Sequence, residues 1–228
     1  MLLFHGSSRI IEKPMYGGGK AYNDYGRGFY CTESLDMASE WAVNLNRDGV
    51  VNRYELDMDS LKILNLNSDK YTILNWLAIL LNNREFDIRT DFADEAKKYI
   101  LSRFLINYED YDIIRGYRAD DRYFAYAQDF LNNLISVRTL SRAMLLGGMG
   151  EQIVLKSSKA FGMIEYKGYT DAINSDWYSL KARRDLSARQ QYKMMRREPW
   201  RRGETYILQI IDEEISDEDE RIRFKPSV

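Results

Sequence analysis

The chain of 228 residues contains one histidine, His5, so any chemistry that needs an imidazole must take place at that position. His5 follows the apolar run Leu2-Leu3-Phe4 and precedes Gly6. An apolar run that stops at His-Gly predicts a strand that enters the core and leaves at a tight turn, with the ring and the Gly6 backbone facing a cleft. A half-buried histidine that only satisfies its own hydrogen bonds explains the same pattern, and for a single residue it is the commoner case.

A second segment with chemical character covers residues 24–34 and reads Asp-Tyr-Gly-Arg-Gly-Phe-Tyr-Cys-Thr-Glu-Ser. Its glycines, Gly26 and Gly28, permit a positive φ or a close backbone approach. Residues 29–32 are predicted to form a short strand, and Ser34 can cap a helix after it. Tyr30 then lies on the strand and Trp41 on the helix. One face of that helix is expected to consist of Leu35, Ala38, Ala42 and Leu45.

The order of these motifs resembles a known family. His5-Gly6, then Gly26-Arg27-Gly28-Phe29-Tyr30, then an aromatic residue eleven positions after that tyrosine, is similar to the His-Tyr-Glu branch of ADP-ribosyltransferases, which includes diphtheria toxin and the poly-ADP-ribose polymerases. The resemblance continues to about residue 166 and narrows to an uncharacterised bacterial family assigned to the same clan. The segments that carry it further are residues 49–56, 83–84, 111–116, 119–121 and 151–156.

The resemblance implies an α+β fold with a split β core of the ADP-ribosyltransferase type and inserted helices. Residues 1–166 would form the NAD-binding domain, and residues 167–228 a C-terminal extension packed on the same domain. NAD would be the substrate, and no metal is implied.

The resemblance also implies roles for individual residues. His5 would hydrogen-bond the adenosine-side ribose, and Gly6 would bind the nicotinamide carboxamide through its backbone. Tyr30 and Trp41 would stack on the nicotinamide ring, where planar aromatic rings suit a planar cation. Ser7, Gly28 and Phe29 would complete the set of residues that bind NAD.

The third motif departs from the family pattern. Its relatives use a glutamate there, whereas this chain has Glu151 followed by Gln152 at the start of an expected strand. Neighbours on a strand face opposite ways, and Gln152 before Ile-Val-Leu is the register that resembles the family. An amide can bind the nicotinamide-ribose hydroxyl but cannot act as a general base, so single-unit transfer or NAD hydrolysis is favoured over polymer formation. Ala38 also stands where a serine usually precedes the second aromatic residue, with Ser39 next to it.

These observations favour a mono-ADP-ribosyltransferase that transfers ADP-ribose from NAD to a protein or nucleic acid and releases nicotinamide. By resemblance it would be a bacterial toxin or phage-defence effector, with an antitoxin protein as a partner. An NAD glycohydrolase and a non-catalytic protein that binds ADP-ribose or NAD are the alternatives. A module that binds nucleic acid through residues 181–202 is a further one.

Composition agrees with a soluble enzyme, because 45% hydrophobic and 30% charged residues in 26.9 kDa can bury one good core. The single cysteine, Cys31, excludes an internal disulfide and is interpreted as a small strand residue rather than a nucleophile. No signal peptide is recognised, and the apolar stretch at residues 73–81 is too short to span a bilayer. A cytoplasmic location without membrane contact is expected.

The middle of the chain is predicted to be helical, over residues 71–83, 92–105, 123–134 and 136–146. Glycines at residues 147–150 then precede the strand expected at 152–156, either as a target-recognition loop or as a plain connector. Asp120 and Asp121 follow another expected strand at 111–114. Two adjacent carboxylates could contribute to a metal site, but no histidine or cysteine lies nearby to complete one. Capping of the next helix is a sufficient explanation for one of them.

The composition changes after residue 166. Nine Lys or Arg occur between Lys181 and Arg202, against Asp185 and Glu198 only. We expect a helix here that ends at Pro199, then a strand over residues 204–211 and an acidic turn region over 212–220. The basic helix either pairs with the acidic segment on a solvated surface or contacts a nucleic acid or a partner protein.

Overall fold

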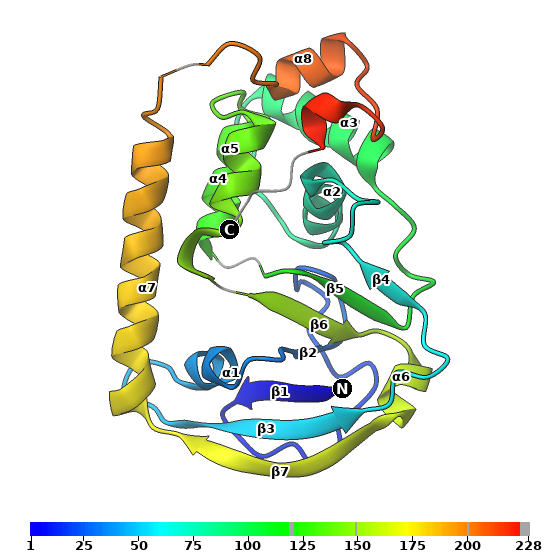
Figure 1. Ribbon diagram of the computed structural model, residues 1–228, viewed down its shortest axis with the longest axis vertical. Helices are drawn as coiled ribbons and strands as arrows, with labels where there is room; N and C mark the ends of the chain where they lie inside the picture. The colour runs from blue at the N-terminus through cyan, green and yellow to red at the C-terminus, as the bar shows by residue number, and fades with distance from the viewer. Residues whose placement is uncertain (119–120, 149, 200, 224–228) are drawn as a thin grey trace.

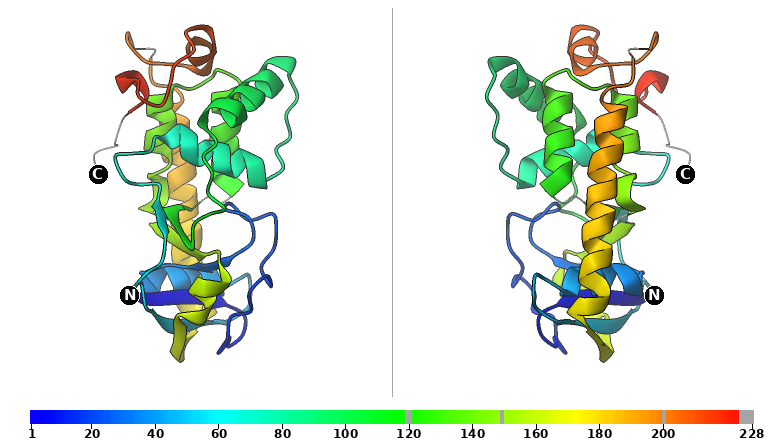
Figure 2. Two further views of the ribbon diagram at one scale, coloured as in Figure 1. Left: turned by 90° about the vertical axis from the view of Figure 1, so that its right-hand side faces the viewer. Right: turned by 90° about the vertical axis from the view of Figure 1, so that its left-hand side faces the viewer.

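The computed structural model describes residues 1–118, 121–148, 150–199 and 201–223, without the side chains of 121–123 and 147. Within these residues the chain is a mixed α+β protein with two β-sheets (Figure 1). A layer of helices lies over one sheet, and one long helix runs along the side of both layers (Figures 1 and 2).

The first sheet is three-stranded and antiparallel, in the order β1-β3-β7. Its strands are β1 (Leu2–Ser7), β3 (Gly49–Leu56) and β7 (Ile164–Ala172). Because β7 pairs with β3 along its length, the sheet contains residues on both sides of the domain boundary predicted at residue 166.

The second sheet has four strands in the order β2-β6-β5-β4. These are β2 (Phe29–Cys31), β6 (Glu151–Leu155), β5 (Ile113–Tyr117) and β4 (Ile63–Asn65). Strands β4 and β5 pair in parallel, and the other two pairings are antiparallel. The strands β2 and β6 lie within one residue of the predicted strands, whereas β5 begins two residues later than the strand predicted at 111–114.

Within the described residues, a single backbone bridge joins the two sheets, and buried side chains of both sheets also pack together. The Phe4 N–H donates to the Thr32 carbonyl at 2.8 Å, and the Thr32 N–H donates to the Phe4 carbonyl at 2.9 Å. Backbone groups alternate between the two sides of a strand, so the N–H and C=O of Gly6 point to the same side as those of Phe4. The N–H and C=O of Gly6 therefore point toward β2. Gly6 lies two residues beyond the bridge residue Phe4, where β1 and β2 are no longer paired.

Helix α1 (Leu35–Ala42) packs directly on β1. Ser34 caps it as predicted, accepting a hydrogen bond from Met37 N at 3.2 Å. The expected apolar face is partly wrong, because Leu35 and Leu45 are 42% and 68% exposed. The helix ends at Ala42, so the helical period does not reach Leu45. The buried apolar residues are Met37, Ala38 and Ala42, and Ser39 and Glu40 are buried as well.

The helical layer contains α2 (Ile73–Asn83), α3 (Asp91–Phe104), α4 (Asp121–Leu131) and α5 (Val137–Ala143). All four were predicted, with ends that differ by a few residues. Every residue of α2 from Ile73 to Leu81 is buried, as expected for a helix too apolar for a surface. The short helix η1 (Leu146–Gly148) and α6 (Ser158–Gly162) flank β6.

The C-terminal part departs from the prediction in two places. Helix α7 (Asn174–Met195) stops before Arg196, whereas the sequence suggested continuation to Pro199. Residues expected to form a strand form instead the helix α8 (Ile207–Asp212). Ile207 and Ile210 are both buried, and their spacing of three fits a helix rather than a strand. A final helical turn is η2 (Glu220–Ile222).

The basic segment is paired within the protein, but not with the acidic segment at 212–220. Its ion pairs join Arg184 to Glu40, Arg189 to Asp185, Arg196 to Asp129, and Arg201 to Glu198. In the acidic segment, Glu213 and Asp219 instead pair with Arg221, and the Asp217 side chain accepts from Asn75. The predicted pairing of the two segments is therefore not found among the described residues.

None of the helices in the ranges that the structure describes combines the length and the apolar character needed to cross a bilayer.

Gly6→Ala is expected to destabilise the protein strongly. A Cβ at residue 6 would lie 1.9 Å from the Ala38 carbonyl oxygen and 2.8 Å from the Ala42 nitrogen, both backbone atoms of α1. The helix must move off β1, at a cost at or above the about 1–3 kcal/mol typical of overpacking. Urea unfolding measures the free energy of unfolding.

Gly162→Ala in α6 is the matched control, because nothing lies within 4 Å of a Cβ there. We expect that variant to stay within about 1 kcal/mol of the wild type. A Gly6→Ala protein as stable as the control would show that α1 does not pack on β1 as described.

Candidate functional site

His5 lies inside β1 rather than at its end. The strand continues through Gly6 and Ser7, which pair in register with Val51 and Val50 of β3. The tight turn predicted at Gly6 is therefore wrong. The glycine is required there because α1 approaches the strand too closely for a side chain.

The surroundings of His5 define its tautomer. Its Nδ1 lies 2.7 Å from the Tyr30 carbonyl oxygen. A carbonyl oxygen only accepts, so Nδ1 carries the proton and Nε2 is the acceptor. Burial lowers the pKa of His5 below 6.5, and the hydrogen bond to Tyr30 only partly opposes this effect. The ring is thus neutral near pH 7, with the Nε2 lone pair available to a hydroxyl donor.

The His5 ring packs against an aromatic cluster. It lies 4.4 Å from the Phe29 ring, which in turn contacts Tyr54 at 5.4 Å and Phe161 at 6.3 Å. Successive side chains alternate between the faces of a strand, so the Tyr30 ring lies on the other face. The structure therefore links His5 to Tyr30 through the backbone and places their rings on opposite sides of β2.

Tyr30 is held by two hydrogen bonds of its hydroxyl. It donates to the Gly26 carbonyl at 2.6 Å and accepts from Tyr25 N at 3.1 Å. Burial raises the pKa of Tyr30 well above its ordinary value of 10.0, so the phenol stays protonated. Gly28, the other glycine of the motif, allows β2 to approach β6, because a Cβ there would lie 2.5 Å from Val154 Cγ1.

Trp41 packs against the same side of the second sheet as Tyr30 and Val154. The Arg118 guanidinium lies over its ring, 4.7 Å from the centroid. Its indole N–H is buried without a hydrogen-bond partner among the described residues. Buried donors are rarely left unpaired, so this one calls for an acceptor. Ser39, in contrast, bonds to the Leu35 carbonyl at 2.9 Å within its own helix.

The two residues at the start of β6 have different environments. Gln152 is 4% exposed and donates through Nε2 to Asp24 Oδ2 at 3.1 Å. Val154 pairs opposite Tyr30, and Gln152 shares its face because it lies two positions away. Glu151 lies on the other face, where it pairs with Arg115 and accepts from Asn67.

Residues 24–28 form a tightly held segment over this face of the sheet. The Tyr25 hydroxyl donates to the Tyr117 carbonyl at 2.6 Å and accepts from Trp76 Nε1 at 2.9 Å. Lys156 Nζ donates to the Tyr25 carbonyl at 2.6 Å. Burial raises the pKa of Tyr25 and lowers that of Lys156. Sequence reasoning missed this network, because its members are far apart along the chain and give no local signal.

Asn52 is a second residue that sequence reasoning missed. It is fully buried, and its Nδ2 donates to the His5 carbonyl at 3.3 Å, to Ser7 Oγ at 3.0 Å and to the Arg9 carbonyl at 3.3 Å. Its Oδ1 accepts from Ile11 N at 2.7 Å. One amide therefore fixes the chain from His5 to Ile11 as it leaves β1.

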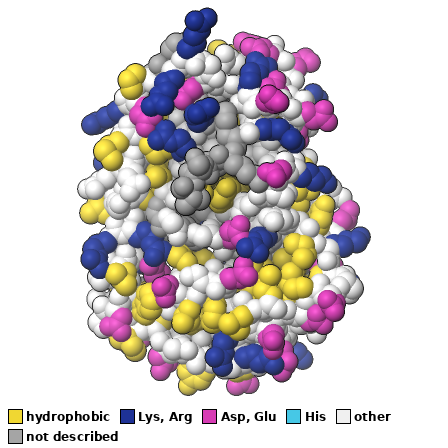
Figure 3. Space-filling model, in the orientation of Figure 1, with side chains coloured by type: hydrophobic (Ala, Val, Ile, Leu, Met, Phe, Trp, Pro, Cys, Tyr) yellow, Lys and Arg dark blue, Asp and Glu magenta, His cyan; other side chains and the backbone are white. Residues whose placement is uncertain are grey.

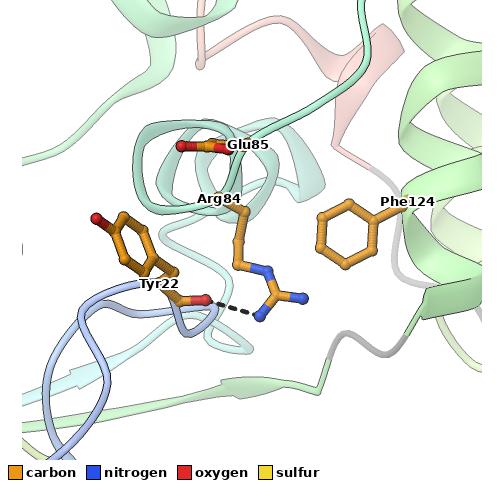
Figure 4. Close-up of a pocket in the computed structure, with 4 residues that line it drawn as sticks. All are labelled: Tyr22, Arg84, Glu85 and Phe124. Atoms are coloured by element: carbon orange, nitrogen blue, oxygen red, sulfur yellow. Dashed lines mark hydrogen bonds between the residues drawn. The ribbon is translucent and has the colours of Figure 1, made fainter.

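One hollow is lined in part by the segment 24–28, and a second lies beside Arg84. One of about 400 Å³ lies beside Phe161 and Gly28. It is also lined by Tyr16, Gly17, Ala21, Gly26, Arg27, Asn83, Glu109 and Lys156. The other, of about 660 Å³, is lined by Tyr22, Arg84, Glu85 and Phe124 (Figure 4). Arg84 lies between the two aromatic residues in that view, donating to the Tyr22 carbonyl at 2.7 Å.

Several sequence candidates carry less weight. Cys31 is fully buried and its pKa is raised by burial, which suits a strand residue. Asp120 and the side chain of Asp121 lie outside the described residues. On the face shown in Figure 3, basic and acidic side chains are intermixed rather than separated into one-sign patches.

A comparison with known families adds one finding. In the part of the chain that the structure describes, the protein is a mixed α+β protein. Its two sheets share one backbone bridge, and polar side chains lie beside that bridge. Residues 1–166 match the family model described as a protein of unknown function, DUF3990, and the chain belongs to that family. No curated protein and no solved structure gives a significant match.

The titration of His5 tests the site directly. Proton NMR of the imidazole Cε1–H should give a midpoint below 6.5, because burial disfavours the charged ring. As the only histidine, it gives an unambiguous signal. The contribution of neutral His5 to the free energy of unfolding is fully present above pH 6.5. It is lost as the pH falls through the lower pKa of the folded state.

His5→Gln is the control, since it should remove both the signal and that part of the pH dependence of unfolding. A midpoint at or above 6.5 would contradict the buried, neutral ring.

Proposed function

We propose that the protein is an NAD-dependent mono-ADP-ribosyltransferase with a fold of the ADP-ribosyltransferase type. One observation carries the proposal. Among the described residues the two sheets share one backbone bridge, Phe4–Thr32, and the residues of the first two motifs flank it. His5 is bonded to the Tyr30 backbone, while the Gly6 backbone faces the side where the strands part.

The arrangement suits the nicotinamide end of NAD. An amide backbone offers one donor and one acceptor, which match the two groups of a carboxamide. Trp41 already has a planar cation, Arg118, against its ring, and a nicotinamide ring is also a planar cation. Tyr30 lies on the same side of the sheet as Trp41, and its hydroxyl is fixed by a hydrogen bond to the Gly26 carbonyl. Both aromatic residues therefore support a stacking site.

The adenosine end would lie on the other side. The His5 Nε2 can accept from a ribose hydroxyl, given the tautomer set by Tyr30. The aromatic cluster leads from His5 through Phe29 to Phe161, which lines the hollow of about 400 Å³. A ring system of adenine size could occupy that hollow.

The reaction needs little covalent help from the protein. The bond between C1′ of the ribose and the nicotinamide nitrogen breaks, and its electron pair leaves on neutral nicotinamide. An acceptor hydroxyl or amine then bonds to C1′ and gives up a proton to solvent. Gln152 orients the ribose but cannot take that proton, which favours the transfer of single units. With water as acceptor, the same step is NAD hydrolysis.

The acceptor and biological role follow from the resemblance. We propose a macromolecular acceptor, either protein or nucleic acid, and a role as a toxin or phage-defence effector with an antitoxin partner. Residues 181–202 would contact the acceptor. The internal ion pairs of Arg184, Arg189, Arg196 and Arg201 count against a protein whose only function is nucleic-acid binding.

Release of nicotinamide from NAD is the primary test. The purified protein should cleave NAD, and His5→Ala should abolish turnover, because no other imidazole exists. Tyr169→Ala, an exposed change on β7, is the control and should leave cleavage unchanged. In the matched pair at β6, Gln152→Ala should lower kcat more than Glu151→Ala. Loss of activity in the Glu151 variant alone would show that Glu151, rather than Gln152, is the third-motif residue and that the usual glutamate chemistry applies.

Tryptophan fluorescence tests the stacking site. NAD should quench the emission of the wild type, since an indole stacked on a cationic ring loses fluorescence. The quenching should disappear in Trp41→Phe, while the emission of the other three tryptophans, Trp76, Trp177 and Trp200, remains as background. Equal quenching in both proteins would assign Trp41 to core packing alone.

A further inference from the structure

The geometry points to Asp24 as a positioning residue that fixes the amide of Gln152. Asp24 would hold the amide so that its carbonyl oxygen, rather than its NH₂ group, is presented to the nicotinamide ribose. This inference rests on the proposed cleavage of NAD and concerns the residue that replaces the usual glutamate.

The hydrogen bond between the two residues determines the orientation. Gln152 Nε2 lies 3.1 Å from Asp24 Oδ2, and both side chains are buried, at 4% and 6% exposure. An ionised carboxylate only accepts, so the group that faces it must be the NH₂. The two ends of an amide point in different directions, and Oε1 is therefore directed away from Asp24.

The second oxygen of Asp24 faces a different donor. Asp24 Oδ1 lies 4.0 Å from Arg84 Nη1. Arg84 is itself fixed, because it donates to the Tyr22 carbonyl and lies 4.6 Å from the centre of the Phe124 ring (Figure 4). One oxygen therefore accepts a hydrogen bond from Gln152 while the other lies within ion-pair distance of Arg84, whereas an asparagine has a single oxygen to offer.

The backbone around Asp24 holds the carboxylate in place. Asn83 Nδ2 lies 3.5 Å from the Asp24 carbonyl oxygen. The following residue, Tyr25, donates its N–H to the Tyr30 hydroxyl, and its carbonyl accepts from Lys156. A shift of Asp24 would therefore disturb Tyr30, the aromatic residue of the same motif.

The orientation has a chemical consequence. Positive charge develops on the ribose as nicotinamide leaves, and groups aimed at developing charge contribute most to the rate. A carbonyl oxygen there carries partial negative charge, whereas an NH₂ group carries partial positive charge. The charged hydrogen bond from Asp24 also polarises the amide, which strengthens the negative end. The effect is expected in kcat more than in KM.

Asp24→Asn separates the two roles. The asparagine side chain has only one oxygen, and the positive charge of Arg84 attracts that oxygen. The new NH₂ group then faces Gln152. The amide of Gln152 is expected to flip, so that its oxygen accepts from the asparagine and its NH₂ faces the ribose. We expect kcat for nicotinamide release to fall roughly tenfold, the size of one hydrogen bond, with KM changed less than about threefold. Asp87→Asn, which alters an exposed carboxylate paired with Arg89, is the control.

The reciprocal exchange gives the decisive comparison. Gln152→Glu alone places two carboxylates together and should lower both kcat and the free energy of unfolding. Combined with Asp24→Asn, it restores the hydrogen bond with reversed polarity and presents a carboxylate to the ribose. We expect the double variant to recover kcat to at least the wild-type value. Urea unfolding of all four proteins should show the same non-additive recovery.

These outcomes distinguish the inference from the proposed function. If the wild type binds and cleaves no NAD, the proposed function fails, and the unfolding cycle still decides whether the Asp24–Gln152 bond is made with this polarity. If the wild type is active, wild-type kcat in Asp24→Asn would overturn the positioning role. A folded double variant no more active than its weaker parent would overturn it too.

Discussion

The pair of hydrogen bonds between Phe4 and Thr32 is the constraint on which the rest of the architecture depends. Among the residues that the structure describes, it joins the three-stranded sheet to the four-stranded one at a single residue pair. Beyond the bridge β1 continues, with the Gly6 backbone directed toward β2 where the two strands are no longer paired. Because α1 packs on that same stretch of β1, the bridge also determines where Trp41 lies relative to Tyr30.

Local signals in the sequence identified much of this arrangement. Ser34 as a helix cap, the apolar helix after residue 71, and the strand pattern around Tyr30 are properties of short segments, so they could be read directly. Gly6 was misread because a glycine that permits a turn and one that permits close packing look the same in a sequence. The strand expected at 204–211 was misread because a short apolar run fits either period until its packing partners are known.

The interior of the site could not be predicted for a different reason. Asn52 and Asp24 act through partners that lie far from them in sequence, and buried polar groups are stable only when every donor and acceptor is matched. Such networks have no periodicity to recognise. The sequence indicated that Gln152 shares the register of the third motif, but only the structure shows which carboxylate it contacts.

Helix α7 has a mechanical consequence. In its first half Lys181 donates to the Val43 carbonyl, just after α1, and Arg184 pairs with Glu40 of α1. Near its end Tyr192 donates to Asp129 of α4 at 2.6 Å. A helix is stiff over this length, so it keeps the sheet layer and the helical layer at a constant separation. Slow opening of the two layers against each other is then suppressed. Any ligand of the proposed site would then exchange through local motions of the chain rather than through a hinge between the two layers.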